Sequence, residues 1–456
     1  MMIKTSLTAA AVALALIAIP RADQPPPAAP PQQPSDISTT ISGEAGAPPR
    51  LAVPDFIAVS KDAESVAIAK TIGQVLRDDL EFEREFSFIP KDVMATVPAA
   101  TSMNDVPFDR WRELNADGVI VGTVEKTAGG VRVTMRLFNV RTRQSAYGRE
   151  YNGSNARLIA HTISDEVHKT QRALEGVARS KITFSSDRDG ERMTGTVLER
   201  DVKEIYIADY DGENQKRVTV GRTLNITPRW SPDARSIAYT SYRRGEPQIF
   251  VSHIYQGTLD ELTKGAGSGQ NWLPAWSPDG QRICFGSTRG GGPSQLYVMN
   301  KDGSGLKRLT NDKWVNTTPT WSPSGNQIAF VSDRTGNPQI YIINADGVGA
   351  PQRISTAESY ADKPSWSPPP YNEIAYTART GPGNDIKIID MATRQVRQIT
   401  FGEGTNESPT WAANGRHFAF MSTRSGKSQI FTIDRLGKGL KQITKIGNNQ
   451  QPDWSR

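Results

Sequence analysis

The chain has 456 residues, of which 37% are hydrophobic and 22% are charged, so it is long enough for two sizeable domains and has the composition of a folded protein. Its net charge is only +6 and its Lys and Arg residues form no basic run, which argues against a nucleic-acid partner. The 39 glycines and 30 prolines predict many turns and few long helices. The single cysteine, Cys284, cannot form an internal disulfide and is expected in the core.

Residues 1–22 have the layout of a secretory signal. Lys4 precedes an apolar stretch from Leu7 to Ile19, and the small residue Ala22 offers a cleavage position. The apolar stretch is short for a bilayer, although an uncleaved membrane anchor is the alternative. No later segment reaches the apolar length of a membrane span, so we expect a soluble mature chain.

Residues 23–50 are rich in proline and contain only two large aliphatic residues, Ile37 and Ile41. Such a segment cannot bury enough apolar surface to offset the entropy lost on ordering. We therefore expect an extended tail or spacer.

Residues 51–178 predict a small α/β domain. Residues 51–59 read as one strand, and residues 118–126 and 131–140 as a hairpin. After Asp62, apolar residues recur with the spacing of one helix face, at Ile68, Ile72, Val75, Leu76 and Leu80. A second helix, beginning near Ser154 or Asn155, keeps on one side Ile159, Ile163, Val167 and Leu174.

Two histidines, His161 and His168, lie seven positions apart on the second helix and could share a face. No third ligand candidate is near them in the sequence. Two solvated histidines are therefore favoured over a metal site.

Residues 179–456 form a repeat of about 45 residues. Each unit contains a tryptophan, a Ser-Pro-Asp-Gly type of turn, a short strand of alternating large and small residues, an Arg-x-Gly step and two further strands. The tryptophans are Trp230, Trp276, Trp321, Trp366, Trp411 and Trp454. The arginines are Arg188, Arg243, Arg289, Arg334, Arg379 and Arg424. Four strands at this period are typical of a β-propeller blade.

The two ends of the repeat complement each other. The first unit, at Ile182, lacks the strand that leads into a tryptophan, whereas residues 449–454 supply such a strand with nothing after it. We expect the two to share one sheet and close the ring. The predicted fold is an α+β N-terminal domain followed by an all-β, six-bladed β-propeller that the C-terminal strand closes.

The sequence offers little catalytic chemistry. It has no G-x-S-x-G elbow, and its four histidines fall in unrelated contexts. Asp-Gly pairs after Asp187 and Asp209 read as turns rather than calcium loops. The tryptophans and arginines occur in every unit and are therefore assigned to structure; a ring of arginines that binds anions is the alternative if they point into the channel. We expect no cofactor and no metal.

One motif, Asn-x-x-Pro-x-Trp, has a fixed frame and a varied interior. Asparagine suits a left-handed corner where the chain enters a strand, while the next two residues differ in every unit, as in a binding rim on a rigid fold. Trp272 would be an aromatic anchor at a loop tip. The predicted rim comprises Asn225, Ile226, Thr227, Asn271, Trp272, Leu273, Asn316, Thr317, Thr318, Ala361, Asp362, Lys363, Asn406, Glu407, Ser408, Asn449, Gln450 and Gln451.

An exported chain with RLAVPDF and ADGVIVGTV in its first domain, followed by WSPDGxxIAFxSxRxGxxQIYxxNxDG units, resembles the TolB family, the periplasmic component of the Tol-Pal system of Gram-negative envelopes. The resemblance implies a non-catalytic, monomeric periplasmic protein, peripheral to the membrane, with WD40-like (PD40) repeats. It implies that one propeller mouth, here the predicted rim, binds the peptidoglycan-associated lipoprotein Pal, and that the protein supports outer-membrane integrity and cell division.

The resemblance also implies an N-terminal segment that engages TolA, alongside other envelope proteins as partners. The matching residues are Ile37, Ser38, Thr39, Thr40, Ile41, Ser42, Gly43 and Glu44. Two features depart from the family pattern: the proline-rich spacer before this segment, and the unit of Trp366, which has Ala361 in place of asparagine and is expected to be the loosest blade. The alternative function is an exported propeller enzyme or carbohydrate-binding protein that uses the central channel.

Overall fold

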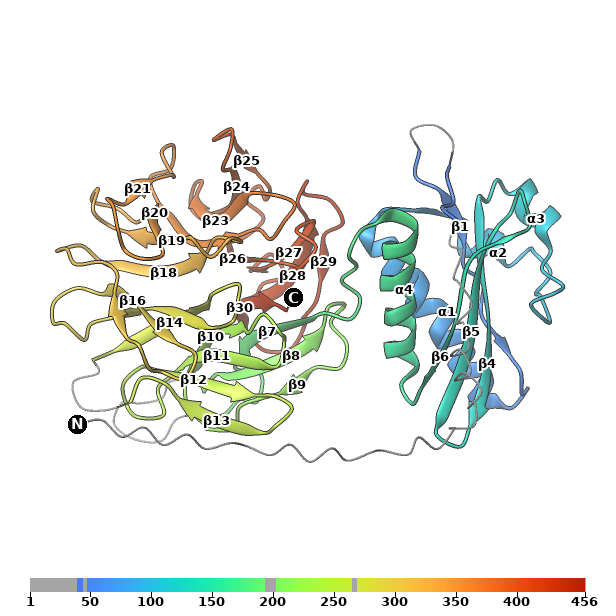
Figure 1. Ribbon diagram of the computed structural model, residues 1–456, viewed down its shortest axis with the longest axis horizontal. Coiled ribbons are helices and arrows are strands. Elements are labelled where there is room, and N and C mark those ends of the chain that lie inside the picture. The colour runs from blue at the N-terminus through green and yellow to red at the C-terminus, as the bar shows by residue number, and fades with distance from the viewer. Residues whose placement is uncertain (1–38, 44–46, 193–201, 265–268, 456) are drawn as a thin grey trace, which may run out of the picture. The chain divides into compact units, whose positions relative to one another are not determined.

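The computed structural model describes residues 39–43, 47–192, 202–264 and 269–455. They form a small N-terminal α/β region and a six-bladed β-propeller (Figure 1). The predicted fold class is therefore confirmed. The signal and most of the proline-rich stretch lie outside the described residues.

The N-terminal region is built on one mixed sheet of order β3-β1-β4-β5-β6, with β2 paired to β4. Its strands are β1 (Arg50–Ala52), β2 (Ile57–Ala58), β3 (Ser87–Phe88), β4 (Gly118–Thr127), β5 (Gly130–Asn139) and β6 (Ser145–Gly153). The β4–β5 hairpin confirms the sequence prediction. The single strand expected over residues 51–59 is wrong, because a segment containing Pro54 separates β1 from β2.

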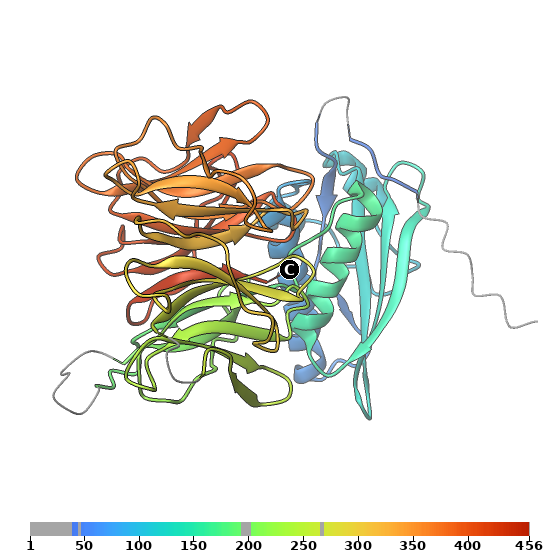
Figure 2. The same cartoon turned by 60° about the vertical axis from the view of Figure 1, so that its left-hand side comes forward.

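Four helices accompany the sheet: α1 (Ala63–Glu83), α2 (Lys91–Met94), α3 (Phe108–Glu113) and α4 (Ala156–Arg172). Asp62 caps α1 by accepting a hydrogen bond from the Ser65 N–H at 2.9 Å, and Asn155 caps α4 in the same way. The two long helices therefore start where the sequence predicts. In both views they lie on the side of the sheet that is turned toward the propeller (Figure 2).

The two histidines of α4 are buried, which corrects the prediction that solvent surrounds them. The ring of His161 bonds to the Asp79 carboxylate of α1 at 2.8 Å, and His168 bonds to the Ser164 carbonyl at 3.1 Å. Burial lowers the pKa of His168 to about 3, so its ring is neutral. The helix face that carries the histidines packs against α1, a contact that periodicity alone did not reveal.

The propeller consists of six four-stranded antiparallel blades. Five are continuous in the chain: β10 (Asn225–Trp230) to β13 (Thr258–Glu261), β14 (Asn271–Trp276) to β17 (Lys307–Arg308), β18 (Asn316–Trp321) to β21 (Gln352–Arg353), β22 (Ala361–Trp366) to β25 (Val396–Gln398), and β26 (Asn406–Trp411) to β29 (Lys441–Gln442). Their second strands are β11 (Ser236–Ser241), β15 (Arg282–Ser287), β19 (Gln327–Ser332), β23 (Glu373–Arg379) and β27 (His417–Ser422), and their third strands are β12 (Gln248–His253), β16 (Gln295–Asn300), β20 (Gln339–Asn344), β24 (Asn384–Asp390) and β28 (Gln429–Asp434).

The sixth blade joins the two ends of the repeat, as the sequence predicts. Its strand order is β30 (Asn449–Trp454), β7 (Lys181–Ser186), β8 (Glu204–Asp209) and β9 (Lys216–Arg217). Asn449 lies opposite Ser186 and Trp454 opposite Ile182. The Trp454 indole N–H also donates to Ser180 Oγ at 2.7 Å, so the closing strand is held by its side chain as well as by its backbone.

The second strands supply the blade cores with fully buried aromatic rings, among them Phe285 and Phe330. Cys284 lies beside them without solvent exposure, and burial raises the pKa of its thiol, which confirms a core role. No helix in the described ranges has the length and apolar character needed to cross a membrane.

The end of α1 is joined to the propeller by a buried carboxyl group. Glu83 accepts hydrogen bonds from Arg416 Nη2 at 2.7 Å, from the Val177 N–H at 2.8 Å and from Asn414 Nδ2 at 3.2 Å. Burial raises the pKa of Glu83 to about 8, although the Arg416 guanidinium opposes the shift. The strength of this contact between the two regions therefore depends on the protonation state of Glu83.

Removal of residues 449–456 should destabilise the entire propeller rather than one blade. The deletion takes away a complete strand and the buried Trp454, and the loss of a buried tryptophan alone costs about 3–5 kcal/mol. We expect the midpoint of thermal unfolding to fall by roughly 10 °C or more, measured by circular dichroism. An unchanged midpoint would show that the ring does not depend on its closing strand.

The contribution of Glu83 to stability should fall as the pH rises from 5 to 8. Because the pKa of Glu83 is raised to about 8 in the folded state, the folded chain keeps a proton that the unfolded chain has lost, which costs about 1.4 kcal/mol of stability per pH unit in this window. Glu83→Gln should make the slope of stability against pH more positive than in the wild type by about 1.4 kcal/mol per pH unit, whereas Glu125→Gln, at an exposed carboxylate, should leave the wild-type slope unchanged. The free energy of unfolding is measured with urea at three pH values. Equal slopes of that free energy against pH in the wild type and Glu83→Gln would contradict the raised pKa of Glu83.

Candidate functional site

The predicted rim lies at one end of the six inner strands. All of its residues occupy the first three positions of β10, β14, β18, β22, β26 and β30. Contacts cross from one triplet to the next: Trp272 Nε1 donates to Thr317 Oγ1 at 3.3 Å, and Lys363 Nζ donates to Glu407 Oε2 at 2.9 Å. Side chains from different blades therefore meet at this end.

The asparagines that open the triplets are buried and do not adopt the left-handed corner expected from the sequence. That backbone conformation belongs to the third residue of each triplet, for example Thr227 with φ 53° and Leu273 with φ 56°. Each inner strand has a shift of register just after the second residue of its triplet. The interpretation of asparagine as a corner residue is wrong, and its role lies in its side chain.

Each buried asparagine ties two blades together. Asn406 Nδ2 donates to Asp385 Oδ1 of the preceding blade at 3.0 Å, and Asn406 Oδ1 accepts from Arg424 Nη2 at 3.0 Å. We call this arrangement the junction amide. The same asparagine-acceptor pair occurs in Asn225 with Glu204, Asn271 with Gln248, Asn316 with Gln295, and Asn449 with Gln429.

The junction amide is absent where Ala361 replaces asparagine. Gln339, at the acceptor position of the preceding blade, still donates to the Glu358 carbonyl at 3.0 Å, as Gln248 and Gln429 donate to carbonyls in their blades. The blade of Ala361 still forms its four strands, and Asp385 takes the acceptor position toward the next blade. Its expected looseness stays a prediction.

The repeated arginines serve the frame in most blades. Arg188, Arg289, Arg334 and Arg424 each donate to a junction asparagine and lie over aromatic rings of their blade. These four guanidinium groups are therefore engaged within the blades, which supports the structural assignment over a ring that binds anions.

The partly exposed positions are the second residue of each triplet and three of the third residues, Leu273, Lys363 and Gln451, whereas Thr227, Thr318 and Ser408 are buried. Asp362, Lys363 and Glu407 form a charged sector, in which the Lys363 ammonium lowers the pKa of Glu407 against the opposing effect of burial. Two residues outside the triplets complete it: Tyr360 donates to Asp362 at 2.9 Å and Asn384 donates to Glu407 at 2.7 Å. Sequence reasoning missed both because they stand outside the repeated motif.

Trp272 lies within strand β14, so the prediction that it stands at a loop tip is wrong. It pairs with Gly286 of the second strand, where a Cβ atom would approach the indole nitrogen to 3.0 Å. The glycine therefore makes room for the indole, which remains partly exposed. Trp272 is the large aromatic side chain of the rim.

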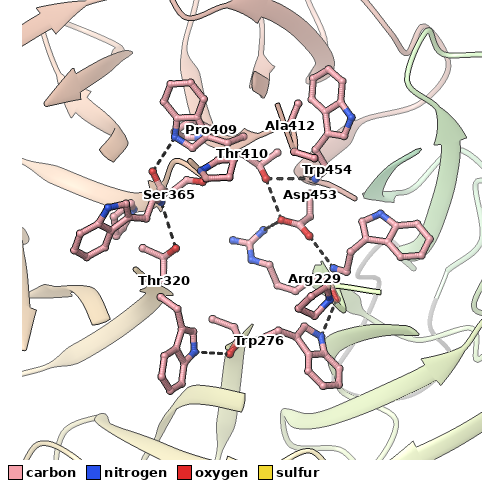
Figure 3. A pocket seen from close by; sticks show the side chains of 18 of the residues that line it. Arg229, Trp276, Thr320, Ser365, Pro409, Thr410, Ala412, Asp453 and Trp454 are labelled. Carbon is pink, nitrogen blue, oxygen red and sulfur yellow. Dashed lines mark hydrogen bonds and ion pairs between the residues drawn. The ribbon is translucent and has the colours of Figure 1, made fainter. Parts of the chain in front are cut away.

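The tryptophan ends of the inner strands surround a narrow cavity of about 110 Å³ (Figure 3). Its only charged lining residues are Arg229 and Asp453, which approach each other to 3.5 Å. The Asp453 carboxylate also accepts from the Trp230 N–H at 2.7 Å and from Thr410 Oγ1 at 3.0 Å. Among the residues that the structure describes, no histidine lines this cavity.

Other titratable groups outside the rim and the cavity have structural roles. Asp79 binds His161 and accepts from Tyr210 at 2.7 Å, and all three are at most 3% exposed, which bars a substrate. The Asp187 and Asp209 segments form turns closed by Gly190 and Gly212. Across the residues that the structure describes, no group of three His, Cys, Asp or Glu side chains could hold a metal ion.

Comparison with known proteins agrees with this architecture. Residues 174–456 match the TolB beta propeller domain, and residues 37–146 match the TolB amino-terminal domain. The chain belongs to the TolB family. The Tol-Pal system protein TolB of Desulfosudis oleivorans is 32% identical over 265 residues, and that of Anaeromyxobacter dehalogenans is 32% identical over 310 residues. The matched stretches cover 57% and 66% of these two relatives and 57% and 67% of this chain.

A solved TolB shares the fold. The crystal structure of TolB from Acinetobacter baumannii superimposes with a TM-score of 0.74, at 24% identity, and covers 92% of this chain and 98% of that one. This TolB-family chain therefore has the same arrangement of an α/β region and a propeller.

Substitution Asn316→Ala should destabilise the propeller. The side chain has no solvent exposure and bonds to Gln295 at 3.1 Å, Asp312 at 2.8 Å and Arg334 at 3.0 Å, so its loss leaves buried groups unpaired, at about 2 kcal/mol. We expect the thermal midpoint to fall by roughly 5 °C. Thr317→Ala, at the adjacent and more exposed position, is the matched control, and equal midpoints for the two variants would exclude a structural role for the amide.

Proposed function

We propose that this TolB-family chain is a non-catalytic, periplasmic scaffold of the Tol-Pal system that docks the lipoprotein Pal on the predicted rim and so supports outer-membrane integrity and cell division. The names of its relatives support its assignment to the Tol-Pal system. The observation that carries the proposal is the rim itself, in which side chains that differ from blade to blade stand on a frame of repeated junction amides. A rigid frame with a varied surface favours recognition of a protein partner.

The chemistry of the rim suits a folded partner. Trp272 and the aliphatic Ile226 and Leu273 provide apolar contact area, while Asp362 and Lys363 provide polar contacts on another sector. Tryptophan is enriched among residues that dominate binding energy, and a polar surround gives orientation. The narrow cavity at the opposite end of the strands offers no comparable surface.

The segment proposed to engage TolA is partly held on the N-terminal sheet and helices. The Ile41 N–H donates to Gln171 Oε1 at 2.9 Å, Gln171 Nε2 donates to the Thr39 carbonyl at 3.2 Å, and Ile41 is 1% exposed. Ile37, Ser38 and Glu44 lie outside the described residues. We propose that binding of TolA through this segment requires Ile41 to leave its buried position.

The test is a pull-down from detergent-solubilised envelopes with the mature protein as bait. We expect the wild type to retain a peptidoglycan-associated lipoprotein and the double variant Trp272→Ala/Lys363→Ala to lose at least nine tenths of it, because an aromatic anchor and a rim cation are removed together. Thermal unfolding confirms that the variant is folded. Mass spectrometry identifies the retained proteins.

A matched control removes one aromatic residue and one lysine elsewhere on the propeller. Tyr255→Ala/Lys301→Ala changes an aromatic residue and a lysine that are exposed on other turns, and it should retain the lipoprotein like the wild type. Equal losses in both double variants would refute the rim, and retention of no envelope protein by the wild type would refute the scaffold.

A further inference from the structure

A second cavity, of about 420 Å³, lies between two neighbouring blades, outside the channel. It is bounded by residues of the β7–β8–β9 blade and of the β10–β13 blade, whose outer strands are labelled in Figure 1. Aliphatic side chains form part of its wall, namely Ile207, Val218, Ile254 and Leu259. The volume falls within the usual range of ligand sites. We call this cavity the side groove.

The side groove is lined by cations and by no carboxylate among the residues that the structure describes. Its basic residues are Lys216, Arg217, Arg243 and His253. Arg217 is neutralised by Glu191 and Glu204, whereas no hydrogen bond or ion pair of Lys216 Nζ or the Arg243 guanidinium occurs within the described ranges. The groove therefore favours an anionic group.

Arg243 differs from its equivalents in the other blades. Arg289, Arg334 and Arg424 each donate to the junction asparagine of their own blade. Arg243 occupies the same position of the repeat, but its guanidinium only lies over the Phe250 ring, at 5.4 Å. The bond to the junction asparagine is therefore missing in the blade that borders the groove, although its asparagine, Asn225, is present; the other exception, Arg379, belongs to the blade in which Ala361 replaces asparagine.

Two further polar atoms of the groove have no partner among the described residues. Thr223 is 5% exposed, and its hydroxyl is buried without a hydrogen bond. Asn225 donates through Nδ2 to Glu204 at 2.8 Å, but no hydrogen bond reaches its Oδ1, where Arg243 would stand by analogy. The Thr223 hydroxyl is closed off within the wall, whereas Asn225 Oδ1 is available to a donor in the groove.

We infer that the side groove binds an acidic segment of extended peptide, a site additional to the rim. Its carboxylate accepts from the Arg243 guanidinium and the Lys216 ammonium, and a peptide N–H donates to Asn225 Oδ1. A neighbouring aliphatic side chain packs against Val218 and Leu259. A bare inorganic anion would leave both the aliphatic wall and the Asn225 acceptor unused, which is why the donor and acceptor set fits a peptide better.

The test uses the full mature chain and a fluorescein-labelled peptide of sequence Gly-Leu-Glu-Val-Glu-Gly, followed by fluorescence polarisation. We expect saturable binding to the wild type and an affinity at least tenfold lower for Arg243→Gln. Arg244→Gln removes the same charge from the next residue, which pairs with Glu261 and does not line the groove, and it should bind like the wild type. A peptide with glutamine in place of glutamate should bind at least tenfold more weakly.

Lys216→Gln supplies a second variant that removes another cation of the groove. It should weaken binding about fivefold with an unchanged thermal midpoint. Absence of saturable binding, equal losses for Arg243→Gln and Arg244→Gln, or equal affinity of the two peptides would each overturn the inference. Because this assay contains no envelope protein, its failure would leave the proposed docking of Pal on the rim untouched.

Discussion

The buried amide at five of the six blade junctions is the interaction on which the propeller depends. A blade cannot bury both faces alone, and neighbouring sheets must be fixed at a constant spacing for a ring to close. The junction amide does so by donating to one blade and accepting from an arginine of its own blade, as Asn406 does between Asp385 and Arg424. Because the bond is buried, its geometry is enforced by the cost of leaving either group unpaired.

Stability and recognition are thereby separated along a single strand. The first residue of each inner strand faces the junction, the next two reach the rim, and the last one packs in the core of the blade, as Trp321 does. The rim positions are free to vary because no junction contact depends on their identity. The same separation explains why Arg243, relieved of its junction bond, is available for another task.

The periodic part of this structure could be predicted from the sequence, because each repeated residue meets the same surroundings in every blade. Blade number, strand order and the closing strand all follow from that regularity. The rim was predicted as a set of positions, but the role of asparagine was not, since hydrogen bonding between blades leaves no trace in local propensity. Tyr360 and Asn384, each present at one place only, gave no repeated signal.

Contacts outside the repeat were the other feature that could not be predicted from the sequence. The burial of His161 and His168 depends on α1 packing against α4, and the bond of Glu83 to Arg416 joins residues more than three hundred positions apart. Neither partner reveals the other by spacing. A charged residue at the end of a helix is ordinarily solvated, so its burial can only be recognised once the chain is folded.

The pairing of β30 with β7 has a consequence for how the protein is made. Strand β7 is synthesised more than 260 residues before its partner, so until β30 is made the first blade presents an open sheet edge. Open edges invite association with other strands, and such distant pairings form slowly. Until the chain is complete, the edge of β7 is therefore the part of the propeller most open to association with other strands.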